Sequence, residues 1–138
     1  LKSSSAKRIP VNSILVAMYG ATVGEVGLLK IDGVTTNQAV GAIIPDLKIA
    51  NSLYLFFFFR LISRFLVGKR VGGGQPNISQ QILREVKVPL PALTEQQKFA
   101  GLVQKVEKLK EKQKQSETQL QNLFNSLMQR AFKGELSL

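Results

Sequence analysis

The spacing of hydrophobic and polar positions changes near residue 94. Before that point, short apolar runs rich in β-branched residues are separated by glycine, proline and asparagine, a pattern typical of strands and turns. After it, apolar residues recur at alternating steps of three and four, as on one face of a helix. The pattern predicts an α+β protein in two parts, with a small mixed α/β domain over residues 1–93 and one long coiled-coil helix over 94–138.

Three apolar runs predict β-strands in the first part, each bounded by residues that favour turns. They cover residues 14–18, 26–31 and 39–44. A fourth run, over residues 86–91, contains Pro89 and Pro91, which lack the backbone N–H that a sheet ladder needs. We expect this run to be an edge strand or an extended connector.

A helix is predicted over residues 53–67, with Asn51-Ser52 as its cap and Gly68 as its end. Arg60 and Arg64 lie four residues apart in this segment, so they share one face of the helix. That face is either the solvated stripe of a core helix or a surface that meets phosphates.

Three consecutive glycines, Gly72 to Gly74, follow this helix. Glycines bury no side chain, so such a run suits a loop whose backbone approaches another molecule closely. Lys69 and Arg70 precede the run, and Asn77 can cap a short helix over 78–85. The segment can therefore present backbone N–H groups and cations to a phosphate. A flexible surface loop with incidental charge is the alternative.

The second part is predicted to be one helix over residues 95–133, with Thr94 as N-cap, Gln97 completing a capping box, and Gly134 as its stop. A rise of 1.5 Å per residue gives it a length of about 58 Å. A compact globule of the size of the first part is only roughly 32 Å across. The helix is therefore expected to reach beyond its own domain and to need a partner.

The apolar stripe of this helix is a heptad seam with a polar centre. Gln113 lies at its midpoint, so an antiparallel pair related by a two-fold axis would place Gln113 against its counterpart, where hydrogen bonds can fix the register. Lys105, Lys110 and Lys112 flank the seam and would repel their equivalents in a parallel pair. The predicted interface consists of Phe99, Leu102, Val106, Leu109, Gln113, Leu120, Leu123 and Leu127.

The composition removes most ordinary catalytic chemistry. The 138 residues include no cysteine and no histidine. Thiolate nucleophiles, Ser-His-Asp triads and the common zinc sites are therefore excluded, and no metal or cofactor is expected. An enzyme would have to bring together two of the acidic residues that precede residue 95, and nothing in the sequence indicates that it does. These residues are Glu25, Asp32, Asp46 and Glu85.

The chain is strongly basic, with 19 Lys and Arg against 9 Asp and Glu, a net charge of +10. Residues 1–94 hold 11 of the cations and 4 of the acids, hence +7. Such an excess favours a polyanionic partner, either nucleic acid or an anionic membrane surface. The most apolar stretch, 53–67, is too short to span a bilayer and contains two arginines. No signal-type segment is evident, so we expect a cytoplasmic protein.

Several motifs, in order along the chain, resemble one known family. The run Pro-Leu-Pro-Ala-Leu-Thr-Glu-Gln-Gln at 89–97 opens the long helix, and Gln-Arg-Ala-Phe-Lys-Gly-Glu-Leu at 129–136 closes it. Upstream, residues 18–24 (Met-Tyr-Gly-Ala-Thr-Val-Gly), 36–39 (Thr-Asn-Gln-Ala) and 74–79 (Gly-Gln-Pro-Asn-Ile-Ser) resemble target recognition domains. By these motifs the chain resembles the specificity subunit of type I restriction–modification systems.

The resemblance implies a protein that binds and does no chemistry itself. Family members carry two target recognition domains, each reading one half of a split double-stranded DNA site, held apart by antiparallel helices. They place methyltransferase (modification) subunits, which use S-adenosylmethionine, and endonuclease/translocase (restriction) subunits on the DNA. This chain has one such domain, with a start that looks truncated, and one helix. The second half is expected from a second copy or from the same longer chain, through antiparallel helix pairing.

The candidate DNA contacts follow from these observations. Lys69 and Arg70 are expected on phosphates, and Gln75 and Asn77 on adenine edges. Loop structure for Gln75 and helix capping for Asn77 are the alternatives. The remaining candidates are Tyr19 and Thr22, from the family-like motif at 18–24, and Gly73 and Gly74, from the glycine run. Two rivals stay open, a coiled-coil scaffold whose globular end binds protein and a general nucleic-acid-binding protein without sequence specificity.

Overall fold

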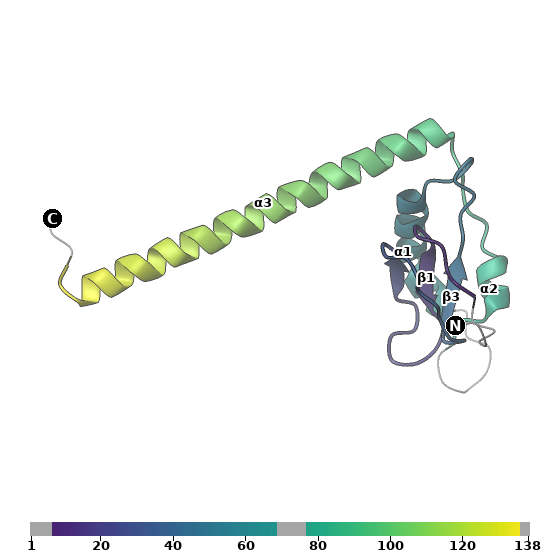
Figure 1. Cartoon of the computed structure of the whole chain (residues 1–138), viewed down its shortest axis with the longest axis horizontal. Helices are drawn as coiled ribbons and strands as arrows, with labels where there is room; N and C mark the ends of the chain where they lie inside the picture. The colour runs from purple at the N-terminus through teal and green to yellow at the C-terminus, as the bar shows by residue number, and fades with distance from the viewer. Residues whose placement is uncertain (1–6, 69–76, 136–138) are drawn as a thin grey trace. The chain divides into compact units, whose positions relative to one another are not determined.

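The computed structural model describes residues 7–68 and 77–135. Contacts divide the chain into two compact units, Leu1–Ala100 and Gly101–Leu138, which are described separately. The α+β class predicted from the sequence is confirmed (Figure 1). The elements are β1 (Ile14–Ala17), β2 (Val26–Leu28), β3 (Val40–Ile43), α1 (Ser52–Gly68), α2 (Gln80–Arg84) and α3 (Leu93–Phe132).

The first unit is built on an antiparallel sheet with the strand order β2-β1-β3. Ile14 pairs with Leu28 on one side and with Ile43 on the other, so β1 is the central strand. Ile14 and Val16 point to one face and are fully buried against α1, where Leu55, Phe59 and Leu66 complete the core. The three predicted strands are confirmed, although β2 ends at Leu28, three residues earlier than expected.

The N-terminus of α1 is capped as the sequence predicts. The Asn51 side-chain oxygen accepts hydrogen bonds from the N–H groups of Leu53, at 2.9 Å, and Tyr54, at 3.1 Å. These bonds satisfy two of the donors that the first turn of a helix leaves free. The helix buries one side on the sheet and leaves Arg60, Leu61 and Arg64 exposed on the other.

The predicted cap of α2 is wrong by two residues. Ser79, in an extended conformation, is the N-cap, and its hydroxyl accepts a hydrogen bond from the Ile82 N–H at 3.2 Å. Asn77 instead forms an isolated antiparallel bridge with Tyr19. The pairing with a distant segment therefore determines the position of Asn77, and the next residue with a suitable hydroxyl caps the helix.

Residues 86–91 form a connector rather than an edge strand, in keeping with their two prolines. The connector is attached to α1, because the Tyr54 hydroxyl donates a hydrogen bond to the Pro89 carbonyl at 2.9 Å. Its last carbonyl, that of Pro91, accepts a hydrogen bond from the Gln96 side-chain amide at 2.8 Å.

Gln96 is fully buried in the first turn of α3. Its oxygen accepts a hydrogen bond from the Asn51 N–H at 2.8 Å, and its nitrogen donates to the carbonyls of Ile49, at 3.0 Å, and Pro91. The amide thus joins the chain before α1, the connector and the start of α3. This is why the first two turns of α3 belong to the first unit.

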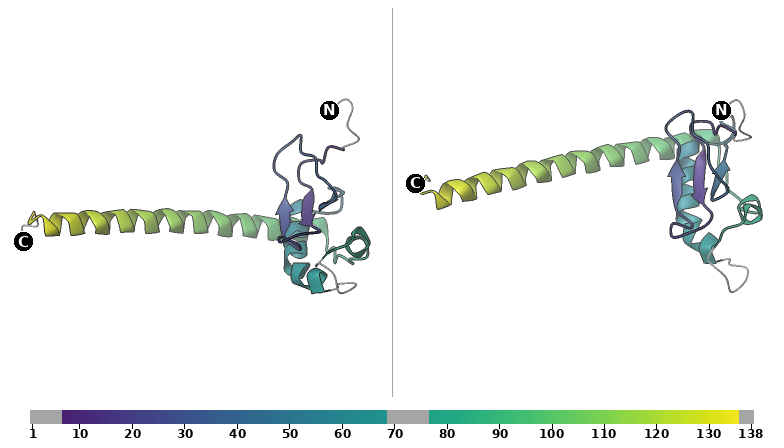
Figure 2. Two further views of the ribbon diagram at one scale, coloured as in Figure 1. Left: turned by 90° about the horizontal axis from the view of Figure 1, so that it is seen from below. Right: turned by 60° about the horizontal axis from the view of Figure 1, so that its bottom comes forward.

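The helix α3 runs without interruption from Leu93 to Phe132 (Figure 2). It begins one residue before the predicted cap, so Thr94 lies inside the helix, and the N–H groups of Glu95 and Gln96 donate to the Ala92 carbonyl. Its end is as predicted. Gly134 has a φ of +73°, and the N–H of Glu135 reaches the Arg130 carbonyl at 3.0 Å, which is a Schellman motif. None of the helices in the described ranges is long and apolar enough to cross a membrane.

Candidate nucleic-acid interface

Three separate segments meet at one end of the sheet, where β1 ends. The Met18 N–H donates to the Ala39 carbonyl at 2.8 Å, and the Met18 carbonyl accepts from the Ile78 N–H at 2.8 Å. The bridge between Tyr19 and Asn77 continues the second contact. Met18 therefore lies between the start of β3 and the segment before α2, and the three upstream motifs singled out in the sequence converge here.

The loop between β1 and β2 supplies Tyr19 and Thr22 to this end. Gly20 and Gly24 both have a φ of +86°, a conformation that residues with a Cβ rarely adopt. The loop is closed by backbone hydrogen bonds from Gly24 to Ala17, at 2.9 Å, and from Glu25 to Thr22, at 2.9 Å. The side chains of Tyr19 and Thr22 on this loop are exposed to solvent.

The segment before β3 adds two amides that the sequence analysis did not select as contacts. The Asn37 side-chain oxygen accepts a hydrogen bond from the Ala39 N–H at 2.9 Å, which forms an Asx turn. Gln38 is exposed at the tip of that turn. Their motif was recognised in the sequence, but only the sheet register brings it beside Tyr19 and Asn77.

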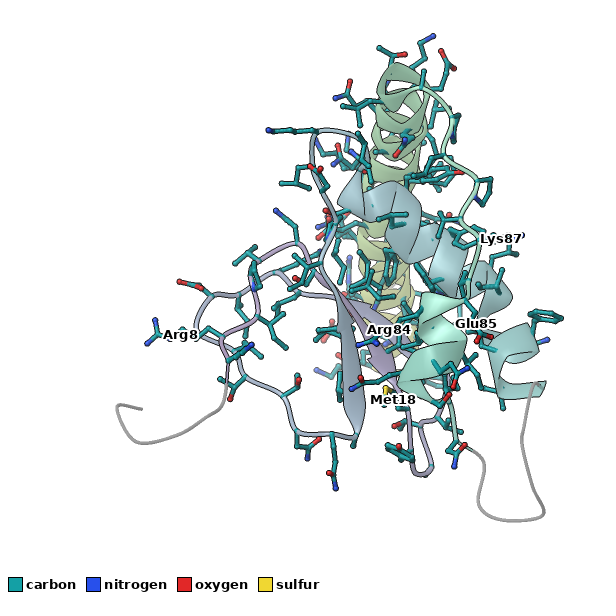
Figure 3. All side chains as sticks on the ribbon, turned by 90° about the vertical axis from the view of Figure 1, so that its right-hand side faces the viewer. Arg8, Met18, Arg84, Glu85 and Lys87 are labelled. Carbon is teal, nitrogen blue, oxygen red and sulfur yellow. The ribbon has the colours of Figure 1, made fainter. Side chains whose placement is uncertain are left out.

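A side chain from α2 borders the same end of the sheet. A Cβ at Gly41 of β3 would lie 2.8 Å from Leu83 Cδ1 and 2.9 Å from Met18 Sδ, so α2 is packed closely on the strand. Arg84 lines a groove between α2 and β3. Figure 3 shows Met18 next to α2, with Arg84 on the helix.

An open groove of about 600 Å³ lies where the β1–β2 loop meets α1. Gly24 and Glu25 line one side, and Arg60, Ser63 and Arg64 line the other. Both arginines are exposed, and neither forms an ion pair with a carboxylate in residues 7–68 or 77–135. Two guanidinium groups one helical turn apart can contact successive phosphates of a nucleic acid backbone.

A comparison with known protein families identifies the family of this chain. The family described as the type I restriction modification DNA specificity domain matches residues 1–122. The chain belongs to this family. The resemblance inferred from the motifs is thereby confirmed.

Relatives of this specificity domain come from archaea and bacteria. The MjaVIII type I restriction enzyme specificity subunit of Methanocaldococcus jannaschii is 34% identical over 92 residues, which cover 67% of this chain and 21% of that protein. The EcoBI specificity subunit of Escherichia coli is 26% identical over 137 residues, covering 94% of this chain and 29% of that protein. The specificity domain therefore spans less than a third of the length of these relatives.

A solved structure shows the same fold. It comes from work on complex assembly and conformational transition of the type I R-M system, and one of its chains superimposes with a TM-score of 0.70 at 22% identity. The match covers 97% of this specificity domain and 34% of that chain.

Of the eight predicted DNA contacts, the structure places Tyr19, Thr22 and Asn77, and it brings Tyr19 and Asn77 together. The other five lie outside the described residues: Lys69, Arg70, Gly73, Gly74 and Gln75.

The second candidate surface of the specificity domain is the seam of α3. In the second unit its apolar members are exposed, with Leu120 at 67% as an example, and Gln113 is exposed between the two apolar stretches. The seam members of this unit are Leu102, Val106, Leu109, Gln113, Leu120, Leu123 and Leu127.

Phe99, the first member of the predicted seam, differs from the others because it belongs to the first unit. Its ring packs edge-to-face on Tyr54 and Phe57 of α1, with centroid distances of 5.8 and 5.9 Å. It is still 37% exposed. Phe99 therefore has partners within its own unit and retains an accessible edge.

Proposed function

We propose that the chain is a DNA sequence-specificity module that recognises one half of a bipartite site in double-stranded DNA. The observation that carries the proposal is the meeting of three polar, family-like segments at one end of the sheet. Tyr19, Gln38 and Asn77 come from these segments, and their side chains, an aromatic ring and two amides, are all exposed.

The side chains at this end suit base recognition. Amides of asparagine and glutamine pair with adenine in the major groove, and hydroxyls such as that of Thr22 contact several bases. Arg60 and Arg64, on the groove next to the loop, supply phosphate contacts that set the position of the domain on the duplex. Lys69 and Arg70 are expected to add to these contacts, and Gly73, Gly74 and Gln75 to approach the bases.

The module acts by binding and performs no catalysis of its own. Its role is to place methyltransferase subunits and an endonuclease/translocase subunit at the recognised site. Family membership supports this role, and the absence of cysteine and histidine from the sequence agrees with it.

The helix α3 provides the link to a second recognition half. An antiparallel copy of the same helix covers the exposed seam, and Gln113 lies near the two-fold axis. With Gln113 on the axis, Ala100 of one copy falls at the level of residue 126 of the other, so about 39 Å of paired helix would separate the two halves, at 1.5 Å per residue. A fixed separation is what recognition of a split site requires.

Selection from a pool of randomised double-stranded DNA tests the proposal. The retained duplexes are expected to share two short elements at a fixed spacing, and the affinity for them should fall as salt is raised. Binding that is indifferent to both sequence and salt would refute the DNA-recognition role. A chain that self-associates but retains no DNA would instead support the coiled-coil scaffold.

A further inference from the structure

An aromatic groove on the first unit is left open to solvent. It has a volume of about 450 Å³ and lies on the exposed side of α1. Leu61 is 81% exposed at its edge. A leucine in that position would gain free energy by being covered. The groove is lined by Tyr54, Phe57, Phe58, Arg60, Leu61 and Phe99.

The apolar face of α3 is wider near its C-terminal end than a two-helix seam needs. At 100° per residue, the apolar residues between Leu102 and Leu109 span about 120° of the helix circumference. Those between Leu120 and Phe132 span about 180°. The extra width comes from a second stripe of exposed residues four apart, Phe124, Met128 and Phe132. A narrow seam is sufficient for one partner helix, so the wide face indicates a second contact.

The register centred on Gln113 indicates which part of the other copy makes this second contact. In an antiparallel pair, residues equally far from Gln113 lie opposite each other, so Leu127 of one copy faces Phe99 of the other. Phe124 and Met128 then fall on either side of the level of Phe99. The wide end of one helix thus reaches the part of the other copy where the aromatic groove lies.

We propose that Phe124 and Met128 of one copy of the chain dock in the aromatic groove of a second copy. The inference rests on the proposed antiparallel pairing of α3 and adds to it a contact outside the seam. Methionine is suited to such a site, because its flexible thioether fills irregular grooves and packs favourably against aromatic ring edges. Each dimer has two such contacts, related by the two-fold axis.

Two pairings of opposite charge favour this register, while Lys112 opposite Lys114 near the axis opposes it. Arg130 of one copy falls at the level of Gln96 of the other, next to Glu95. Glu117 of one copy falls at the level of Leu109, between Lys108 and Lys110 of the other. A parallel pair would instead place each of these charged residues next to the identical residue of the other helix.

Disulfide trapping tests the docking directly, because the chain has no cysteine of its own. The double variant Leu61→Cys with Met128→Cys is expected to form a covalent dimer within minutes of mild oxidation at micromolar concentration. The matched control is Ile31→Cys with Met128→Cys, since Ile31 is 67% exposed in the loop after β2. The control is expected to cross-link at least about tenfold more slowly, as chance encounters do.

Substitutions that introduce opposite charges at Leu61 and Met128 give a second test. Both side chains are exposed, so the variants are expected to fold. Leu61→Glu alone and Met128→Lys alone should each raise the dimer dissociation constant about tenfold. The two together should restore it to within about threefold, as the opposite charges meet. Ile31→Glu should leave it unchanged.

The outcomes separate the docking from the pairing on which it rests. A dimer in sedimentation with equal cross-linking of the two cysteine pairs overturns the docking and leaves the pairing intact. Fast cross-linking of Met128→Cys alone indicates a parallel pair and overturns both. A chain that stays monomeric at 100 times the concentration used for trapping also overturns both.

Discussion

Gly24 lies directly against Val67. A Cβ at Gly24 would overlap Cγ2 of Val67 and come within 3.5 Å of the Ser63 carbonyl oxygen. The loop that carries Tyr19 and Thr22 therefore packs on α1 through a position that has no side chain. This close approach sets the width of the groove beside Arg60 and Arg64.

Gly24→Ala is expected to destabilise the first unit more than Gly20→Ala. Both glycines have a φ of +86°, so both variants incur the cost of a left-handed backbone, about 1 kcal/mol. Only Gly24 has a neighbour within 4 Å of the added Cβ, and overpacking adds about 1–3 kcal/mol. Urea unfolding followed by tyrosine fluorescence measures the difference, since both tyrosines lie in the first unit. Equal losses in the two variants would contradict the tight contact.

Gln96→Leu should remove about 2–4 kcal/mol from the free energy of unfolding of the first unit. The change leaves the Asn51 N–H and the carbonyls of Ile49 and Pro91 without the partner they have now. Gln97→Leu, at the exposed neighbouring position, is the control and should change the stability by less than about 0.5 kcal/mol. The same urea titration applies, and a small loss for Gln96→Leu would mean that water replaces the amide.

Arg60→Ala with Arg64→Ala should weaken DNA binding and flatten its salt dependence. If each arginine neutralises one phosphate, the slope of log K against log salt falls by about 1.8 per bound chain. The control is Lys30→Ala with Lys48→Ala, which removes the same charge from segments that follow the far ends of β2 and β3. Fluorescence anisotropy at several salt concentrations separates the two pairs of substitutions. An equal effect of both pairs would show that only net charge matters.

Leu120→Glu should weaken self-association, and Val106→Lys in the same chain should restore it. The two positions are equally far from Gln113, so only an antiparallel pair brings the new carboxylate of one copy to the new ammonium group of the other. Both native side chains are exposed, at 67% and 49%, so the substitutions leave no cavity in a core. Sedimentation equilibrium reports the dimer fraction. A double variant as weak as Leu120→Glu alone would exclude this register.

The elements of the fold were predictable because their signals are local. Asn51 caps α1 and Gly134 ends α3 as the sequence predicts, since each acts on the turn next to it. Asn77 was misassigned because its place depends on Tyr19, far away in the sequence. No such pairing can be read from residue spacing.

The burial of Gln96 and the make-up of the candidate site could be predicted only in part, for the same reason. Gln96 sits among polar residues, and nothing near it in the sequence distinguishes a buried amide from a solvated one. Its burial follows from the meeting of α1, the connector and α3. The motifs around Tyr19, Asn37 and Asn77 were each visible, but their convergence required the strand order of the sheet.

The hydrogen bonds of Met18 have a consequence for the chain that leaves the sheet after α1 and returns before α2. Gly68 is the last residue of α1, which packs on the sheet, and the Ile78 N–H donates to the carbonyl of Met18, directly after the central strand. Once its ends are held, doubling the length of a chain segment costs only about 0.6 kcal/mol. The first unit should therefore keep its fold when the chain between these two attachment points is lengthened or replaced.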